Sequence, residues 1–463
     1  MCSLNDCRYN DDNETPNNAK DAVMNATQCR KCRFEDVDVL LVGQSGYCKT
    51  CFLTVTNHKF RAALGKSKII RHGDLILIDH SGELNATVLL HLIRAGMSES
   101  AHKKLIFKII VLYIDDSVVM GRTNEERNTL QHKIAEEIKD YGFNGYVVSL
   151  SQVLSKEDIL SIIPIDQQQI NNENDDQLYT ILANLSDETS RTDLLSQLRR
   201  RLLLSAARKL NCNKVFIADS AMDIATKVLG DICLGRGAQL SVLANFCDTR
   251  CTDVKILKPL RDFTQQELLY YSKYHRIESV KLRELIVTIP TTSIQTLACN
   301  FTIELDSQFS GTVSTIFRTA EKVSAKFNEQ QDMENNCVLC DIRLNSVPFS
   351  DEVSAMRAVA VSKWISSKCG DTKTLPNGKE NGTSHCILPQ LNNKVCSNGE
   401  CDCKKSKEIQ LTDEDIWRCL CYSCGQIFRN SEILNTFPAS LLFEVQQRMA
   451  LKNMREEIND FLL

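Results

Sequence analysis

The sequence lacks any excess of basic residues. Its 55 lysines and arginines stand against 59 acidic residues, so the 463-residue chain carries a formal net charge of −4. This balance excludes a surface that attracts nucleic acid over its whole extent, and any RNA contact must come from a local basic surface or from a partner subunit. No apolar stretch approaches the ~20 residues of a membrane span, and the polar N-terminus contains no secretory signal. We therefore expect a cytoplasmic protein with no membrane partner.

Cysteine, by contrast, is abundant, with 21 residues. Without a secretory signal, paired cysteines with CxxC spacing favour zinc in a reducing compartment over disulfides. Cys29 and Cys32 form one such pair, and Cys48 and Cys51 form another close behind it. Four thiolates at this spacing suit a tetrahedral structural zinc site. Free cysteines, or an iron–sulfur cluster with the same four ligands, are the alternatives.

A second set of paired cysteines predicts another structural zinc site. Its members are Cys337, Cys340, Cys421 and Cys424. The two pairs are far apart in sequence and can meet only through the fold, which adds little closure entropy. Cys419 competes with Cys421 as a ligand. Neither set has an evident open coordination position, so both are predicted to be structural rather than catalytic.

The apolar pattern predicts an α/β fold. Short apolar runs at 75–78, 105–114, 145–150, 214–218 and 254–257 alternate with helical patterns, notably at 124–140 and 193–210. Such alternation is typical of a parallel twisted sheet flanked by helices. We divide the chain into a disordered N-terminus (1–28), a zinc-ribbon-like module and linker helix (29–70), an α/β domain (71–330, with a polar insertion at 165–190), and a C-terminal cysteine-rich module (331–463, with a flexible insertion at 366–410).

Residues 74–93 predict a strand, a short loop and an amphipathic helix, which is the arrangement of a phosphate-binding loop. Gly82 lets backbone approach a phosphate closely. Glu83 opposes this, because a carboxylate ~4 Å from a phosphate costs roughly 1–4 kcal/mol. On this segment alone, an ordinary turn between a strand and a helix is the simpler interpretation.

The loop resembles the Ser-Gly-Gly-x-x-Ser loop of the N-type ATP pyrophosphatases, although Glu83 and Ala86 replace its second glycine and its closing serine. Two more segments, residues 231–240 around Arg236 and residues 258–262 followed by Glu267, narrow the match. They resemble one branch of this superfamily, the cytoplasmic tRNA 2-thiolation protein 2 family, which forms the second subunit of the cytosolic thiouridylase. The resemblance runs from about Cys29 to Cys424. It implies a Rossmann-like, adenine nucleotide alpha-hydrolase-like fold with a cysteine-rich zinc module at each end.

The same resemblance implies that catalytic chemistry has been lost. Sulfur-handling relatives carry a CxxC ahead of a basic pair. Matching that pair to Arg199 and Arg200 places the two cysteines at Thr192 and Leu195, and we expect Thr192 to cap the following helix instead. Of the acids in the family's Gly-His-Asn-x-Asp-Asp motif, Asp223 alone remains, since Met222 cannot bind Mg²⁺.

These matches predict specific site residues. No catalytic residue is assigned. The remnant of the nucleotide loop comprises Ser81, Gly82, Thr87 and Asp223. Contact with RNA or with a partner is predicted for Arg199, Arg200 and Arg236. Basic residues around the first cysteine set can also hold an RNA backbone. The altered loop argues against ATP as a cofactor of this subunit.

The resemblance implies a subunit of a sulfurtransferase complex that 2-thiolates the wobble uridine (5-methoxycarbonylmethyl-2-thiouridine) in tRNA Lys, Glu and Gln. Its heterodimer partner is the catalytic thiouridylase subunit, which receives sulfur from a thiocarboxylated ubiquitin-related modifier. Two alternatives stay open: an autonomous tRNA-adenylating ATP pyrophosphatase, and a zinc-ribbon RNA-binding protein without catalysis.

Overall fold

The computed structural model describes residues 28–41, 46–99, 104–155, 160–167, 174–280, 293–309, 311–323, 336–344 and 411–462. The predictions of disorder before Gln28 and of a flexible insertion at 366–410 lie outside these ranges. Across the described ranges, no helix combines the length and apolar character that crossing a membrane requires.

One seven-stranded sheet forms the centre of the molecule, with strand order β4-β3-β2-β1-β5-β7-β6. The strands are β1 (Leu75–Asp79), β2 (Lys108–Asp115), β3 (Asn144–Ser149), β4 (Ile163–Pro164), β5 (Lys214–Phe216), β6 (Cys247–Asp248) and β7 (Lys255–Leu257). The five inner strands are parallel, and the edge strands β4 and β6 are antiparallel to their neighbours. The inner five correspond to the apolar runs of the sequence, which confirms the predicted α/β fold with a parallel sheet.

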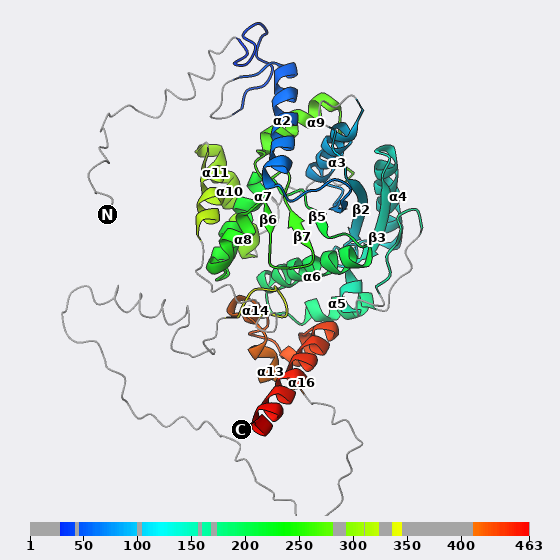
Figure 1. The fold of residues 1–463 in the computed structure, drawn as a ribbon, viewed down its shortest axis with the longest axis vertical. Helices are drawn as coiled ribbons and strands as arrows, with labels where there is room; N and C mark the ends of the chain where they lie inside the picture. Colours follow the sequence, from blue (N-terminus) through cyan, green and yellow to red (C-terminus); the bar gives the residue numbers. More distant parts are fainter. Residues whose placement is uncertain are drawn as a thin grey trace, which may run out of the picture.

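Helices cover both faces of this sheet (Figure 1). The helices are α2 (Lys49–Ser67), α3 (Leu84–Met97), α4 (Asn124–Asp140), α5 (Asn174–Ala183), α6 (Glu188–Lys209), α7 (Ala221–Cys233), α8 (Leu240–Ala244), α9 (Gln265–His275), α10 (Ile294–Gln308), α11 (Thr312–Lys322), α13 (Asp413–Arg418), α14 (Tyr422–Ile427), α15 (Ile433–Thr436) and α16 (Ala439–Leu462). Two short 3-10 turns, η1 (Leu150–Leu154) and η3 (Gly237–Gln239), complete the described elements.

The side chains of β1 show how the two faces are assigned. Ile76 and Ile78 are buried in one core with residues of α2, α3, α4 and α9. Leu77 is buried in the other, with residues of α5, α6 and the C-terminal helices. Because alternate residues of a strand point to opposite faces, Asp79 continues the α6 side and His80 continues the α4 side. Their partners agree: Asp79 pairs with Arg199 of α6, and His80 with Glu137 of α4.

Three helices depart from the predictions. Helix α6 begins at Glu188 rather than near Asp193, because the side chain of Asp187 accepts from the backbone N–H of Ser190 and caps it. Helix α5 lies inside residues 165–190, which we predicted to be a polar insertion and to which we assigned no helix. Helix α2 begins at Lys49, between two cysteines of the first set, so it is part of the cysteine module rather than a linker after it.

The C-terminal module packs directly on the α/β domain. Its buried residues, including Val338, Ile416 and Val445, belong to the same apolar cluster as Leu198 and Leu202 of α6. In Figure 1, helices α13, α14 and α16 lie at one end of the molecule, and α2 and α9 lie at the other. The two cysteine sets are therefore held at opposite ends of the fold.

Candidate functional site

The loop after β1 has the backbone conformation of a phosphate-binding loop, but it carries an acidic side chain. Gly82 has φ = 82°, a left-handed conformation that favours glycine. Glu83 follows as the N-cap of α3, and its carboxylate makes no capping hydrogen bond to the helix. The backbone N–H of Glu83 donates to Ser81 Oγ at 3.3 Å. The loop thus delivers the start of a helix to the carboxyl end of the sheet, but places an acid at the position where an anion would bind.

Asp223, the surviving acid of the predicted motif, is occupied by neighbouring donors. Its Oδ2 accepts from Asn85 Nδ2 at 3.0 Å, from the Ser220 backbone N–H at 2.9 Å and from Ser220 Oγ at 2.6 Å. Ser220 and Asp223 form the capping box of α7. Asp223 therefore joins the N-termini of α3 and α7, which is a structural role.

Thr87, the remaining member of the predicted loop remnant, is also turned inward. It is buried on α3, and its Oγ1 donates to the backbone carbonyl of Glu83 at 3.3 Å. The structure therefore brings Ser81, Gly82, Thr87 and Asp223 to one place, the joined N-termini of α3 and α7.

Acids at the ends of the first two strands are bound to arginines. Asp79 pairs with Arg199 at 2.9 Å. Asp115 is buried, forms an ion pair with Arg127, and accepts from Ser117 Oγ at 2.6 Å. Such pairs leave little carboxylate oxygen for a magnesium ion or a ribose at this edge of the sheet.

Lys258 is a buried lysine at the same edge of the sheet. In the sequence, it is notable only as part of a segment that resembles the family. It follows β7 directly, and its Nζ donates to the carbonyl of Leu243. Burial lowers the pKa of Lys258 to about 8, although Asp219 and Asp248 oppose this. A lysine directly after an apolar strand is the signal that could have singled it out.

The expected positions of the lost sulfur-handling cysteines lie on α6. Thr192 is inside this helix and does not cap it, since Asp187 is the N-cap, so that prediction is wrong. Leu195 is half-buried and packs against the apolar cluster that α6 shares with the C-terminal module. Met222 packs against the apolar cluster of α7, α8 and α11. Leu195 and Met222 therefore pack against the core, and Thr192 is a partly buried residue of α6.

Arg236 is buried, with 3% of its surface exposed. Its Nη2 lies 2.6 Å from Asp193 Oδ2 of α6, and its Nη1 lies 3.2 Å from Asp231 Oδ1 of α7. The preceding Gly235 has φ = 82°, and a side chain there would meet the ring of Tyr422 in α14. This loop therefore joins α6, α7 and the second cysteine module, and the geometry gives no support to the contact with RNA or a partner that we predicted for Arg236.

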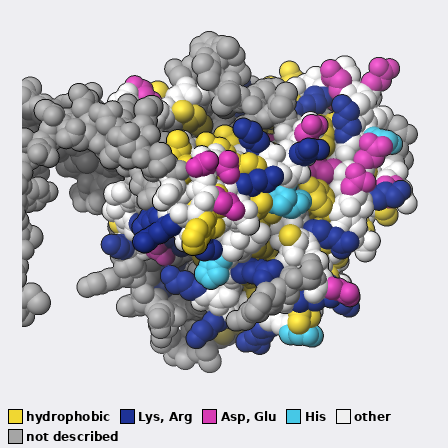
Figure 2. All heavy atoms as spheres, turned by 90° about the horizontal axis from the view of Figure 1, so that it is seen from above, with side chains coloured by type: hydrophobic (Ala, Val, Ile, Leu, Met, Phe, Trp, Pro, Cys, Tyr) yellow, Lys and Arg dark blue, Asp and Glu magenta, His cyan; other side chains and the backbone are white. Residues whose placement is uncertain are grey.

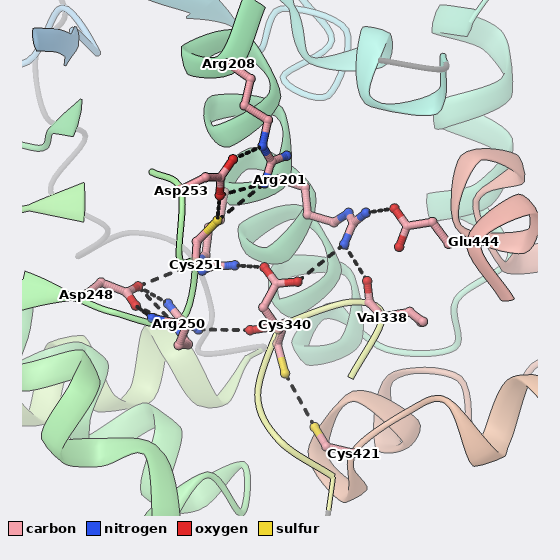
Figure 3. Close-up of polar contacts among 12 residues, drawn as sticks. Arg201, Arg208, Asp248, Arg250, Cys251, Asp253, Val338, Cys340, Cys421 and Glu444 are labelled. Atoms are coloured by element: carbon pink, nitrogen blue, oxygen red, sulfur yellow. Dashed lines mark hydrogen bonds and ion pairs between the residues drawn. The ribbon is translucent and has the colours of Figure 1, made fainter. Parts of the chain in front are cut away.

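Three arginines of α6, Arg200, Arg201 and Arg208, bind the C-terminal module or β6 and the loop after it. Arg200 pairs with Asp341 at 2.6 Å and approaches Asp248 at 3.6 Å. Figure 3 shows Arg201 reaching Glu444 and the carbonyl of Val338, while Arg208 reaches Asp253.

Arg250, which follows β6, also joins the α/β domain to the C-terminal module. Its guanidinium binds Asp248 and approaches the carbonyl of Cys340 at 3.5 Å. The basic residues of α6 and its surroundings thus fasten the C-terminal module to the α/β domain.

The first cysteine set converges as predicted. The sulfurs of Cys29, Cys32, Cys48 and Cys51 all lie within 4.8 Å of one another. Cys32 Sγ and Cys48 Sγ are 3.9 Å apart, and the backbone N–H of Cys51 donates to Cys48 Sγ. Burial raises the pKa of the Cys29 thiol, but neighbouring backbone N–H groups outweigh this and lower it to about 6. These donors favour the thiolate of Cys29, the form that binds metal, whereas burial raises the pKa of Cys48 and Cys51.

The second cysteine set also converges, although its pairs are far apart in sequence. The sulfurs of Cys337, Cys340, Cys421 and Cys424 lie within 4.8 Å of one another. Cys340 Sγ and Cys421 Sγ are 3.6 Å apart (Figure 3). Cys419 is buried outside this group, and its carbonyl accepts from the backbone N–H of Val338. Cys421 and not Cys419 therefore completes the set.

The sulfur spacings test whether these groups fit a metal. A tetrahedral ion with bonds of about 2.3 Å to sulfur needs sulfurs about 3.8 Å apart. The 3.9 Å and 3.6 Å separations match this value. In a four-iron cluster each thiolate binds a different iron, so its sulfurs lie farther apart. Both sets can therefore hold a single metal ion.

Comparisons with known sequences point to one family. The profile of the family described as "Cytoplasmic tRNA 2-thiolation protein 2" matches residues 293–426. The protein of that name from Xenopus tropicalis is 27% identical over 94% of each chain. That from Drosophila willistoni is 32% identical over 74% of this chain and 84% of its own.

Among solved structures, the fold is similar to a U34-tRNA thiolase, NcsA from Methanococcus maripaludis with its [4Fe-4S] cluster. The TM-score is 0.49 and the sequence identity 16%, over 73% of this chain and 96% of that one. Sequence identity and mutual coverage with the relatives above decide the assignment. The chain belongs to the cytoplasmic tRNA 2-thiolation protein 2 family.

Proposed function

We propose that this chain is a non-catalytic subunit of a cytoplasmic complex that 2-thiolates tRNA. The modified base is the wobble uridine, which becomes 5-methoxycarbonylmethyl-2-thiouridine in tRNA Lys, Glu and Gln. The names of the relatives support the reaction and the compartment. The state of the nucleotide loop supports the absence of catalysis.

The observation that carries this proposal is the engagement of polar groups at the carboxyl edge of the sheet. The carboxylate of Asp223 caps α7 and binds Asn85, and Asp79 is paired with Arg199. Glu83 adds a negative charge at the start of α3. At ~4 Å from a phosphate this charge costs roughly 1–4 kcal/mol, which weakens ATP binding by one to three orders of magnitude.

The proposed partner is the catalytic thiouridylase subunit, which has an intact phosphate loop, in a heterodimer. Adenylation of the uridine needs ATP and magnesium, and sulfur transfer needs reactive thiols. Here the corresponding positions are Glu83, Met222, Thr192 and Leu195, none of which supplies those groups. Sulfur would reach the partner from a ubiquitin-related modifier with a C-terminal thiocarboxylate.

We further propose that zinc fills both cysteine sets. Four cysteine ligands at separations of 3.9 Å and 3.6 Å suit its tetrahedral preference. With all four positions taken by protein sulfur, the ion has no site for a substrate. It would supply folding energy rather than catalysis.

The experiment compares the purified chain, the partner and their complex. ATP cleavage to AMP and pyrophosphate in the presence of tRNA is measured by chromatography, and thiolated tRNA by its retardation in mercury-containing gels. We expect no activity from the chain alone and thiolation by the complex. ATP cleavage by the chain alone would instead identify an autonomous adenylating enzyme. A chain that binds tRNA but never co-purifies with the partner would be a zinc-ribbon RNA-binding protein.

Glu83→Gly sharpens the test. If Asp79, Asp223 and the core-filling residues also exclude catalysis, restoring the glycine leaves the chain inactive. A variant that gains ATP cleavage would show that Glu83 alone silences the site.

A further inference from the structure

Helix α2 and the segment after it form a local basic surface on an otherwise acidic chain. From Lys49 to Gly73 the sequence contains six lysines and arginines and no aspartate or glutamate. Lys49, Lys66, Lys68 and Arg71 are exposed, and Arg61 is partly exposed. Figure 2 looks down on the end of the molecule that carries α2, and it shows many Lys and Arg side chains there. This is the kind of local surface that an acidic protein needs in order to hold RNA.

Most cations of this surface are available, unlike the four arginines of α6 described above, although the Nζ of Lys49 lies 5.3 Å from the centroid of the Tyr274 ring. Lys59 pairs with Glu267 at 2.7 Å. In the part of the chain that the structure describes, the side chains of Arg61, Lys66, Lys68 and Arg71 form no ion pair. In α6, by contrast, Arg199, Arg200, Arg201 and Arg208 each contact a carboxylate. Free cations bind phosphate without first losing an intramolecular partner, so α2 is the better RNA surface.

Phe34 lies in the first cysteine module, from which α2 begins. Its exposure is 94%, the highest of the described large hydrophobic side chains. A hydrogen-bonded turn holds its loop, because Cys29 N–H donates to the Glu35 carbonyl and Arg33 N–H donates to the Cys29 carbonyl, both at 2.8 Å. The turn holds an aromatic ring in solvent, in a segment that carries Arg30, Lys31 and Arg33 as well as Glu35 and Asp36. Exposed aromatic rings among basic residues are what unpaired RNA bases stack on.

We propose that Phe34 and the cations of α2 and residues 68–71 form the face that holds tRNA in this subunit. Phosphates lie along α2, whose 19 residues span about 28 Å at 1.5 Å per residue. An unpaired base stacks on Phe34. This inference rests on the proposed function, because it takes tRNA as the substrate of the complex. The first cysteine module contributes the aromatic ring and no net positive charge to this face. Its three cations, Arg30, Lys31 and Arg33, are balanced by three acids, Glu35, Asp36 and Asp38.

The test uses the complex with its partner and a tRNA Lys transcript, with binding measured by fluorescence anisotropy at several salt concentrations. Arg61→Gln/Lys66→Gln removes two charges and keeps helix propensity. Each lost phosphate contact lowers the slope of log K against log salt by about 0.7–0.9. We expect the slope to fall by roughly 1.5 and the affinity at ~0.1 M salt to fall tenfold or more.

Lys133→Gln/Lys139→Gln is the matched control, because both lysines are exposed on α4, another helix of the domain. It should leave affinity and slope unchanged. Phe34→Leu should weaken binding about fivefold or more at an unchanged slope, and Phe34→Trp should restore it, because stacking carries no counterion release. Metal content and circular dichroism of each variant check that it is folded.

The proposal is wrong if the α2 variant binds tRNA as tightly as the α4 control. It is also wrong if the α2 variant loses the partner subunit while keeping tRNA, because α2 would then be a protein interface. These outcomes differ from a failure of the proposed function. If the proposed function is wrong, the wild-type complex does not thiolate tRNA at all.

Discussion

Replacing Arg236 by methionine should destabilise the protein by about 3–5 kcal/mol, the range found when one partner of a buried ion pair is removed. The guanidinium lies between Asp193 at 2.6 Å and Asp231 at 3.2 Å, and only 3% of the residue is exposed. Methionine has a similar length and fills the space, so little of the loss comes from a cavity. The cost arises because two carboxylates are left buried without their cation.

The loss should depend on pH in a defined direction. In the wild type, burial already raises the pKa of Asp231, and Asp193 adds to this while Arg236 opposes it. Without Arg236, the pKa of Asp231 rises further above its unfolded value. The folded variant then binds more protons than its unfolded chain, so its deficit grows as pH rises through the raised pKa of Asp231. The deficit should be larger at about pH 8 than at about pH 5.

Urea denaturation followed by circular dichroism measures the free energy of unfolding of each variant. Arg418→Met is the control, since its pair with Glu414 is exposed at 2.6 Å and should contribute under about 1 kcal/mol. Adding Asp193→Asn and Asp231→Asn to Arg236→Met should recover part of the loss. A deficit below about 1 kcal/mol, or one that does not change with pH, would refute the reasoning.

Two further predictions concern the cysteine sets and a half-buried histidine. Cys337→Ser/Cys340→Ser should remove one metal per chain and speed hydrogen exchange in α6, which shares the core of the second cysteine set. Cys29→Ser/Cys32→Ser should remove one metal per chain and speed hydrogen exchange in α2 instead. Unchanged metal content by mass spectrometry would contradict both predictions. Burial and the nearby His275 lower the pKa of His91 from 6.5 to about 4. The folded state therefore loses stability as pH falls through this window, and His91→Gln should flatten the loss; thermal melts that remain parallel would contradict this.

The sheet could be predicted from the sequence because its inner strands are buried on both faces. A strand such as β2 is then a nearly continuous apolar run, which local composition reveals. The first cysteine set was equally visible, since its four ligands lie within 23 residues from Cys29 to Cys51. The edge strands β4 and β6 have two residues each and carry no such pattern.

The roles of the charged residues could not be predicted in the same way. Arg199, Arg200 and Arg236 looked available in the sequence, but their partners come from distant segments: Asp79, Asp341 and Asp193. Pairing of this kind depends on how α6 packs, and the start of α6 was itself misplaced because Asp187 caps it. The convergence of the second cysteine set was a hypothesis that only the fold could support.

The continuous core between α6 and the C-terminal module gives the second cysteine set an influence beyond its own ligands. The sheet, α6 and the second cysteine set share one apolar core, so an ion bound by these cysteines would contribute to the folding of the α/β domain as well. A shortage of metal would then act on this protein as a mild denaturant. If a metal fills this site, the amount of folded protein would follow the supply of that metal.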